Sequence, residues 1–335
     1  MYAAAISRAL IALAALSLFG CDAPGSADGD GGTTDTDDIM NAPSDGEPGA
    51  CSHATRVGGV KIDVRSDYPS ISGAVAGGVV PMHIWFEVED GKEGDCLLEQ
   101  HIVPSCVEMC GPTETCDYDG TCIPYPVKHS VGTITVGGLA KPVVMEPMGA
   151  AGATMYSFID LQYPFVDPGA KIVAQAAGDE NDFGGFTLHG RGVELIDLLN
   201  EEPVLMADQD LEINWTAGQN DASVTLKINI DQHGASPIRL FCETADTGSY
   251  TLPSTLIDML IASGVTGYPS LSISRRTIER MDMEDVENGC IEFEVSSFLT
   301  RTILVENHIP CQFDYECPDG MTCDETIETC VDIEK

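Results

Sequence analysis

Ser223-Val-Thr-Leu-Lys-Ile-Asn-Ile230 alternates polar and apolar side chains at every position. Successive side chains of a β-strand point to opposite faces, so this period of two predicts a strand with one face in a core. Seven other segments carry a similar pattern, less strictly in the second: Val60–Val64, His83–Val88, Gly132–Val136, Ala170–Ala174, Leu211–Trp215, Ser270–Ser274 and Cys290–Val295. Gly, Pro, Asp and Asn separate these segments, as expected for turns between strands.

The strand segments outnumber the helical ones by far. Many short strands without intervening amphipathic helices favour β-sandwiches over a parallel sheet. One short helix is expected near Pro253–Ala262, with Ser254 as its cap. The composition changes around residues 200–203, which suggests a domain boundary. We therefore predict an all-β protein with two β-sandwich domains of the immunoglobulin or fibronectin type, at residues 51–200 and 201–305.

The chain has 13 cysteines, and Cys21 stands apart from the other twelve. An even number suits disulfides, which persist in oxidising compartments and are rare in the cytosol. We expect disulfides at Cys51, Cys96, Cys106, Cys110, Cys116, Cys122, Cys242, Cys290, Cys311, Cys317, Cys323 and Cys330. Zinc is the rival interpretation, but its ligands typically begin two to four residues apart, and these gaps are mostly five.

Eight of these cysteines form an internal repeat. The spacing around Cys106–Cys122 resembles that around Cys311–Cys330, and both stretches read Thr-Cys-Asp at the third cysteine. We predict two small modules held by disulfides, one inserted at about residues 96–126 and one at residues 306–335. Four cysteines allow three pairings, so the connectivity within each module stays open. The simplest pairs for the remaining cysteines are Cys51–Cys96 and Cys242–Cys290.

The N-terminal segment has the pattern of a bacterial lipoprotein signal peptide. Arg8 precedes an apolar run from Ala9 to Phe19, and cleavage after Gly20 leaves Cys21 at the new N-terminus for lipidation. An ordinary secreted protein or an uncleaved anchor is the alternative. Residues 21–50 are acidic and rich in Gly, Ser, Thr and Pro, which predicts a disordered tether. We expect a cell-envelope location at the outer membrane, although Asp22 is also compatible with retention at the inner membrane.

The charge of the chain is strongly one-sided. It has 16 Lys and Arg against 54 Asp and Glu, for a formal net charge of −38. Nucleic-acid binding requires a cationic surface, so this class of partner is excluded. Weak surface binding of Ca²⁺ is compatible with so many carboxylates, but no organised calcium or other metal site is expected, and no cofactor.

Catalytic patterns are few. Asp246-Thr247-Gly248-Ser249 matches the string of aspartic proteases, but that chemistry requires two such aspartates, and no second copy occurs. The string is also typical of a tight turn. The seven histidines form no metalloprotease motif, and no serine-hydrolase elbow, P-loop or dinucleotide fingerprint is present. Trp215 is expected in a core, and Trp85 is a weak candidate for ligand contact because it or Phe86 should face outward.

Several short sequence segments resemble those of surface lipoproteins of the myxobacterial type, which combine β-sandwich repeats with small four-cysteine modules. The similar segments are Phe158–Leu161, Phe165–Ala170, Ala177–Asp179, Phe186–Leu188, Leu211–Thr216, Leu240–Cys242 and Asp246–Pro253. The resemblance covers about residues 150–335 and implies location and architecture, with no functional residue to transfer.

The sequence favours a membrane-anchored binding or adhesion module without catalysis. Its partners are then the membrane, through the lipid on Cys21, and a surface glycan or protein. A structural scaffold of an envelope complex is the alternative, and an extracellular hydrolase is a third hypothesis.

Overall fold

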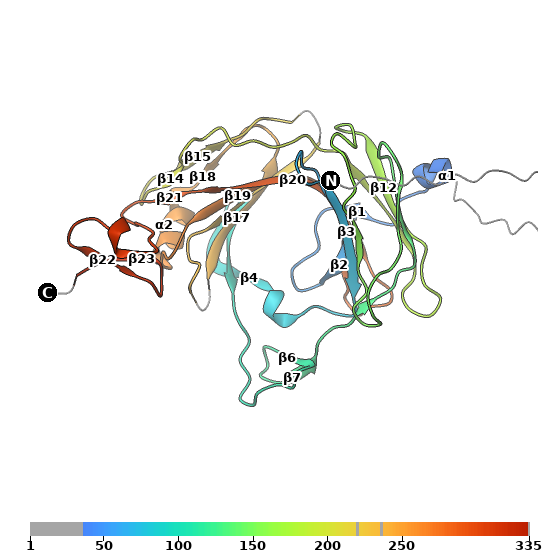
Figure 1. Ribbon diagram of the computed structural model, residues 1–335, viewed down its shortest axis with the longest axis horizontal. Coiled ribbons are helices and arrows are strands. Elements are labelled where there is room, and N and C mark those ends of the chain that lie inside the picture. The colour runs from blue at the N-terminus through green and yellow to red at the C-terminus, as the bar shows by residue number, and fades with distance from the viewer. Residues whose placement is uncertain (1–35, 219–220, 235–236, 334–335) are drawn as a thin grey trace, which may run out of the picture. The chain divides into compact units, whose positions relative to one another are not determined.

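The computed structural model describes residues 36–218, 221–234 and 237–333 (Figure 1). These residues form an all-β fold with disulfide-rich modules, which confirms the predicted class. The largest sheet has 11 strands. They are β1 (Glu47–Pro48), β2 (Arg56–Asp63), β3 (Ser70–Ala76), β4 (Trp85–Glu93), β5 (Cys96–His101), β8 (Lys128–His129), β11 (Tyr156–Phe158), β16 (Ser223–Asn229), β17 (Ile238–Ala245), β19 (Ser270–Asp282) and β20 (Cys290–Thr302).

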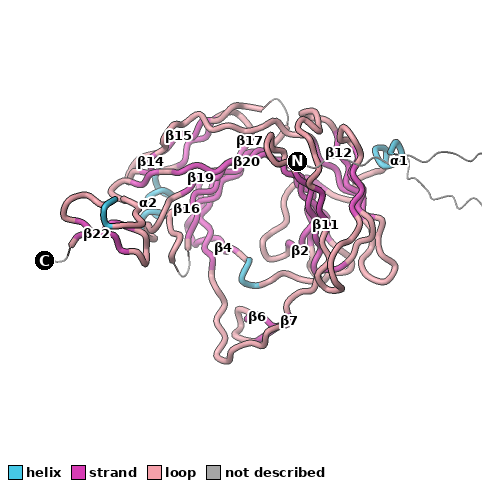
Figure 2. The backbone as a smooth tube through the Cα atoms, in the orientation of Figure 1, coloured by secondary structure: helices cyan, strands magenta, loops and turns pink. Residues whose placement is uncertain are grey.

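The order of this large sheet is β11-β3-β2-β20-β19-β16-β17-β5-β4, with β1 beside β19 and β8 beside β3. Neighbouring strands are antiparallel except for β2 and β20, which run parallel. All eight segments with a β pattern in the sequence lie wholly or largely in strands, in this sheet or in the smaller ones. The sheet curves, as the tube in Figure 2 makes visible, with β4 toward one end and β2 and β11 toward the other.

A smaller sheet and two strand pairs complete the layers. The smaller sheet has the order β10-β9-β12-β13, and the pairs are β14 with β21 and β15 with β18. The bounds are β9 (Ile134–Gly137), β10 (Val143–Met145), β12 (Lys171–Ala176), β13 (Phe186–Arg191), β14 (Val204–Leu205), β15 (Leu211–Asn214), β18 (Ser249–Leu252) and β21 (Leu304–Val305). The helices are α1 (Thr36–Asn41), α2 (Ser254–Ala262) and the single 3₁₀ turns η1 (Pro81–His83) and η2 (Asp314–Glu316).

A first hydrophobic core lies between the smaller sheet and the β3-β2-β20 part of the large sheet. Alternate residues of β2 and β20 enter it, among them Ile62, Phe293 and Val295, and Ile172 and Leu188 enter from the smaller sheet. All five side chains are fully buried. Burial of each such side chain stabilises the fold by about 1.5–3 kcal/mol, so this face of the sheet is fixed by its apolar residues.

A second hydrophobic core lies under the β19-β16-β17-β5 part of the same sheet. Val224, Leu226 and Ile228 of β16 enter it, and Trp215 packs against them from the segment that follows β15. Helix α2 contributes its own buried residues, Leu256, Ile257 and Leu260. Pro253 rather than Ser254 is the helix cap, and the Ser254 amide donates to the Asp210 carboxylate. Trp215 is therefore a core residue, as the sequence predicts.

The two cores share one sheet, so the predicted domain boundary near residue 200 is wrong. Strands β2 and β3 pair with β20, and β5 pairs with β17, which joins both sides of that boundary by backbone hydrogen bonds. The long strands β19 and β20 pass from one core to the other. A boundary drawn from composition misses this because strand pairing links residues far apart in sequence.

The predicted tether is too long at its C-terminal end. Residues 1–35, which include the predicted signal peptide and Cys21, lie outside the described residues. From residue 36 the chain is ordered: Ile39 of α1 is 1% exposed, and β1 pairs with β19. The Asp45 carboxylate accepts a hydrogen bond from the Thr187 amide, so an acidic residue serves here as a specific acceptor. Acidic composition alone does not distinguish a disordered tether from an ordered segment whose carboxylates accept specific hydrogen bonds.

All twelve cysteines from Cys51 onward form disulfides. Cys51 bonds to Cys290 and Cys96 to Cys242, so the simplest pairing suggested by the sequence is wrong. Cys96 and Cys242 lie directly opposite each other on β5 and β17. The inserted module therefore does not begin at Cys96, which belongs to the large sheet. Proximity in sequence is a poor guide here because strand order places distant segments side by side.

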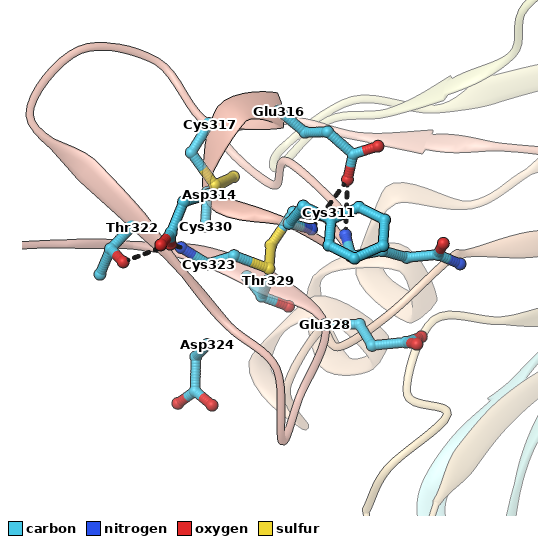
Figure 3. Close-up of a disulfide and its surroundings, with 12 residues drawn as sticks. Cys311, Asp314, Glu316, Cys317, Thr322, Cys323, Asp324, Glu328, Thr329 and Cys330 are labelled. Carbon is cyan, nitrogen blue, oxygen red and sulfur yellow. Dashed lines mark hydrogen bonds between the residues drawn. A yellow bond between two sulfur atoms is a disulfide. The ribbon is translucent and has the colours of Figure 1, made fainter.

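The two four-cysteine modules share one design. In each, the first cysteine bonds to the third and the second to the fourth: Cys106–Cys116, Cys110–Cys122, Cys311–Cys323 and Cys317–Cys330. Each contains one hairpin, β6 (Glu114–Cys116) with β7 (Cys122–Pro124), and β22 (Met321–Asp324) with β23 (Thr329–Asp332). Figure 3 shows the C-terminal module, where the Asp314 carboxylate accepts hydrogen bonds from the Thr322 hydroxyl and the Cys323 amide.

Candidate functional site: the charged face of the large sheet

The face of the large sheet that points away from both cores is polar. On β16, the buried Val224, Leu226 and Ile228 alternate with Thr225 and Lys227, so Lys227 points away from the second core. The same alternation places Arg276 of β19 and Glu294 of β20 on this side. We call this surface the charged face.

Cations gather on the charged face although the chain has only 16 lysines and arginines. The members are Arg56, Lys61, Arg65, Lys128, Lys227, Arg239 and Arg276. Arg56 and Lys61 belong to β2, and Arg65 follows that strand. The other cations lie on β8, β16, β17 and β19, which are far apart in sequence. The large sheet thus collects scarce positive charges from separate segments, and this face differs in charge from the chain as a whole.

Glu294 is the central acid of the charged face. Its carboxylate contacts the Lys61 ammonium at 3.5 Å and the Arg276 guanidinium at 3.3 Å. Burial raises the pKa of Glu294, but Lys61, the Ser296 hydroxyl and Arg276 outweigh burial and hold this pKa below its ordinary value. Arg276 also contacts Glu243 at 2.9 Å. These groups are therefore fixed in place by one another.

A second group of charges surrounds Glu99 of β5. The Glu99 carboxylate lies 2.6 Å from the Arg239 guanidinium and 3.1 Å from Nε2 of His53. Burial opposes ionisation of Glu99, yet His53 and Arg239 hold its pKa below the ordinary value. His53 lies just before β2 in the chain, and β2 and β5 are five places apart in the sheet order. The contact is consistent with strong curvature of the sheet.

Lys227 differs from its neighbours. Among the residues that the structure describes, no carboxylate forms an ion pair with Lys227, and its ammonium lies 5.7 Å from the centre of the Phe241 ring. Lys227 is an exposed residue of β16. Desolvation by its neighbours, together with the positive charges of Arg239, Arg276 and Arg56, holds the pKa of Lys227 below its ordinary value despite the attraction of Glu294. Lys61 behaves in the opposite way, because Glu294 and Asp63 outweigh burial and raise its pKa.

Of the hollows lined by residues of the charged face, two share several of its charged side chains. The larger has a volume of about 630 Å³ and is lined by strands β2, β3, β11, β16 and β20, with Lys128 at one side. The smaller, of about 240 Å³, is lined by Thr225, Ser272, Thr300 and Phe298 together with charged residues. Lys61, Lys227, Arg276 and Glu294 line both, so the two hollows adjoin. The larger hollow falls within the volume of about 300–1,000 Å³ that is common for ligand pockets, and the smaller lies below it.

Trp85 lies at the edge of the charged face but does not present a free ring. The Arg239 guanidinium stacks 3.7 Å from its ring centre, and the His101 ring lies 5.2 Å away. Its neighbour Phe86 points elsewhere and packs edge-on against Tyr118 of the inserted module. The structure therefore brings Trp85 to the charged face with one ring face already covered by Arg239.

The Asp246 string serves a structural purpose. Asp246 accepts hydrogen bonds from the Trp215 indole and from Arg275, whose side chain is 2% exposed. Burial alone raises the pKa of Asp246, while Arg275 and Trp215 hold it below the ordinary value. A carboxylate held ionised by a buried arginine is poorly suited to share a proton with a second acid. Asp246–Gly248 connect β17 to β18, which agrees with the interpretation of this string as a turn.

Two clusters of cysteines have sulfur atoms close enough to hold a metal ion, Cys106 with Cys110 and Cys116, and Cys311 with Cys317 and Cys330. All of these sulfurs are engaged in disulfides, which removes the thiolates that zinc requires. Histidines are dispersed here too: His129 contacts Asp182, whereas His233 contacts Glu328.

The charged face was not predicted from the sequence. In its local sequence, each of these residues resembles an ordinary solvent-facing residue of a half-buried strand. One signal was present: Lys227 is the only charge in the alternating stretch Ser223–Ile230 of a chain that is poor in lysine. Its convergence with Lys61 and Arg276 depends on strand order, which local patterns do not contain.

Comparison with known proteins adds no family to this description. No protein-family model matches the chain, and no curated protein matches it. Among the described residues, every helix is too short or too polar to cross a bilayer.

Proposed function

We propose that this protein is a binding protein of the cell envelope, held at a membrane by lipid on Cys21, and that its charged face receives a surface glycan. The signal-peptide pattern of Met1–Gly20 supports export. The six disulfides of the described residues fit an oxidising compartment.

The arrangement of groups on the charged face carries this proposal. Both hydrophobic cores lie on the opposite side of the sheet, and the charged face opens into two adjoining hollows. Their walls combine hydroxyls of Thr225, Ser272 and Thr300 with the ring of Phe298, which is 38% exposed. Hydroxyl groups can exchange hydrogen bonds with sugar hydroxyls, and an aromatic ring can pack on the apolar face of a sugar.

The anchor is tested by a Cys21→Ala substitution in the full chain. We expect the wild-type protein in the membrane fraction and the variant in the soluble fraction, because the variant cannot receive the acyl chains. Mass spectrometry of the N-terminal peptide checks for the lipid directly. Recovery of both proteins in the same fraction, with an unmodified Cys21, contradicts the anchor.

Glycan binding is tested with the full chain in detergent against an array of polysaccharides, peptidoglycan fragments and intact bacterial cells. We expect saturable binding that Phe298→Ala weakens. Phe313→Ala is the matched control, because Phe313 is similarly exposed at 50% but lies in the C-terminal module. Absence of binding to every saccharide and cell, with recovery of the protein in a complex of fixed stoichiometry, contradicts the proposal and favours an envelope scaffold.

A further inference from the structure

We propose that the hollow around Lys227 binds the carboxylate of an acidic sugar, with neighbouring hydroxyls and Phe298 holding the sugar ring. This inference rests on the proposed function and names the chemical class of its ligand. It is drawn from the charge of the hollow, the missing partner of Lys227 and the side chains that surround both.

The smaller hollow has an excess of positive charge. Lys61, Lys227 and Arg276 line it, and Glu294 is its only carboxylate among the described residues. Glu294 is already engaged by Lys61 and Arg276. Among the described residues, Lys227 is therefore left with three N–H donors and no carboxylate partner, although the chain is rich in acids.

Lys227 lies among other cations and has no carboxylate partner within the described part of the chain. Arg239, Arg276 and Arg56 repel the Lys227 ammonium, and together with desolvation by its neighbours they hold the pKa of this exposed lysine below its ordinary value. An anion bound at this position relieves the repulsion and forms charge-assisted hydrogen bonds with the ammonium group. The geometry and charge of this hollow therefore favour an anionic ligand over a neutral one.

The surroundings favour a small acidic sugar over other anions. Ser272 and Thr300 form a hydrogen-bonded hydroxyl pair, 2.8 Å apart, on the wall of the hollow. Phe298 lies beside them. The Lys61 ammonium and the Arg65 guanidinium approach its ring centre at 5.4 Å and 5.3 Å, and the ring is still 38% exposed, so its uncovered part is the surface that a sugar can contact. A bare inorganic anion needs neither hydroxyls nor a ring, and a long polyanion is repelled by the net charge of −38.

The test measures binding of trigalacturonic acid and of its fully methyl-esterified form to the full chain by titration calorimetry. The two probes share their sugar rings and differ in charge. We expect the acid to bind at least about tenfold more tightly, which is the magnitude of one hydrogen bond to a charged group. Added salt should weaken binding of the acid and leave binding of the ester nearly unchanged.

Lys227→Met is the decisive variant, because methionine keeps most of the apolar side chain and removes the charge. We expect about a tenfold or greater loss of affinity for the acid, no loss for the ester, and a thermal midpoint without ligand at least as high as that of the wild type. Lys141→Met is the matched control, since Lys141 is exposed in the turn between β9 and β10, and we expect no change in either affinity.

The outcomes separate this inference from the proposed function. Equal binding of acid and ester, or unchanged affinity of Lys227→Met for the acid, overturns the inference and leaves a glycan-binding protein with a different site. Inorganic phosphate that competes as well as the acid also overturns it, because the sugar then contributes nothing. Absence of binding to these and all other saccharides overturns both. A lower thermal midpoint of Lys227→Met assigns the lysine a structural role instead.

Discussion

Arg275 and Asp246 illustrate how a single residue pair organises one end of the second core. Both side chains are 2% exposed, and Asp246 also accepts hydrogen bonds from the Trp215 indole and the Gly218 amide. Arg275 uses its remaining donors on the carbonyls of Glu194, Leu195 and Thr216. A buried charge pair is tolerated only when nearly every donor and acceptor is engaged, and this one meets that condition.

Asp246→Ala should therefore be strongly destabilising. The variant leaves the Arg275 guanidinium buried without its carboxylate, and we expect the free energy of unfolding to fall by about 3–5 kcal/mol. Urea unfolding followed by tryptophan fluorescence measures this change, and Asp319→Ala, at an exposed position of the C-terminal module, is the control. A loss no larger than that of the control would show that the pair contributes little.

Acid should unfold the protein through the carboxylates with lowered pKa values. Asp246, Glu99 and Glu294 each have a pKa below the ordinary value of about 4 in the folded state. The unfolded chain then binds more protons than the folded one as the pH falls below the ordinary value. We expect stability from these groups to be fully present above about pH 5 and to be lost as the pH falls through their folded pKa values.

Urea midpoints measured from pH 7 to pH 3 test this acid dependence. Asp246→Asn removes one of the three groups, so the decline of its midpoint below pH 4 should be shallower than in the wild type. An equally steep decline in the variant would assign acid unfolding to other carboxylates. At pH 7 the variant should be the less stable protein, because it lacks the ion pair with Arg275.

At the scale of elements, strand positions were readable from the sequence and strand partners were not. Ser223–Ile230 is a strand because its apolar residues recur at every second position, and the same reasoning locates β2, β9, β12 and β15. Strand β3 was missed, because Ser70–Ala76 mixes Gly and Ala with few larger apolar residues. The Cys51–Cys290 and Cys96–Cys242 bonds, like the charged face, follow from partner choice and so lay beyond local patterns.

The parallel pairing of β2 with β20 depends on glycine. Gly59 has a backbone φ of +141°, and a Cβ atom there would lie 1.9 Å from the Glu292 carbonyl oxygen of β20. We expect Gly59→Ala to push β2 and β20 apart and to lower the thermal midpoint markedly, because both strands supply side chains such as Ile62 and Phe293 to the first core. Gly320→Ala is the control: its φ is also positive, at +93°, but nothing lies within 4 Å of its Cβ position.

Circular dichroism melts of both glycine variants distinguish crowding from backbone strain alone. Both substitutions impose an unfavourable φ on alanine, and only Gly59→Ala adds the contact with β20. Equal shifts in the two variants would mean that the close approach of β2 to β20 is easily relieved.

At the scale of the whole molecule, two cores depend on one continuous sheet. Strands β19 and β20 are 13 residues long each and supply apolar side chains to both cores. Both halves of the sequence contain alternating strands, but each core draws on residues from both sides of position 200. The sequence does not indicate that the halves are joined, because no local pattern tells that β5 pairs with β17 across more than 100 residues.

A fragment of residues 201–335 should therefore fail to fold by itself. It contains most of the second core but lacks β5 and β2, which leaves β17 and β20 with unpaired edges. We expect poor solubility and a circular dichroism spectrum without a cooperative melt, whereas the chain from residue 36 should unfold in one transition. A fragment that melts cooperatively at a temperature near that of the longer chain would restore the domain boundary at residue 200.

The bond between Cys51 and Cys290 has a mechanical consequence. It joins residues separated by 239 positions and fastens the segment between β1 and β2 to the start of β20. When the two ends of the chain are pulled, tension passes from Cys51 directly into β20 and bypasses everything between them. Near the C-terminus, the disulfides Cys311–Cys323 and Cys317–Cys330 close two overlapping loops, so that force cannot extend the residues within them. Force that reaches this protein through its ends therefore runs along β20, which carries Glu294 and Phe298, and the strands of the charged face between Cys51 and Cys290 lie outside its path.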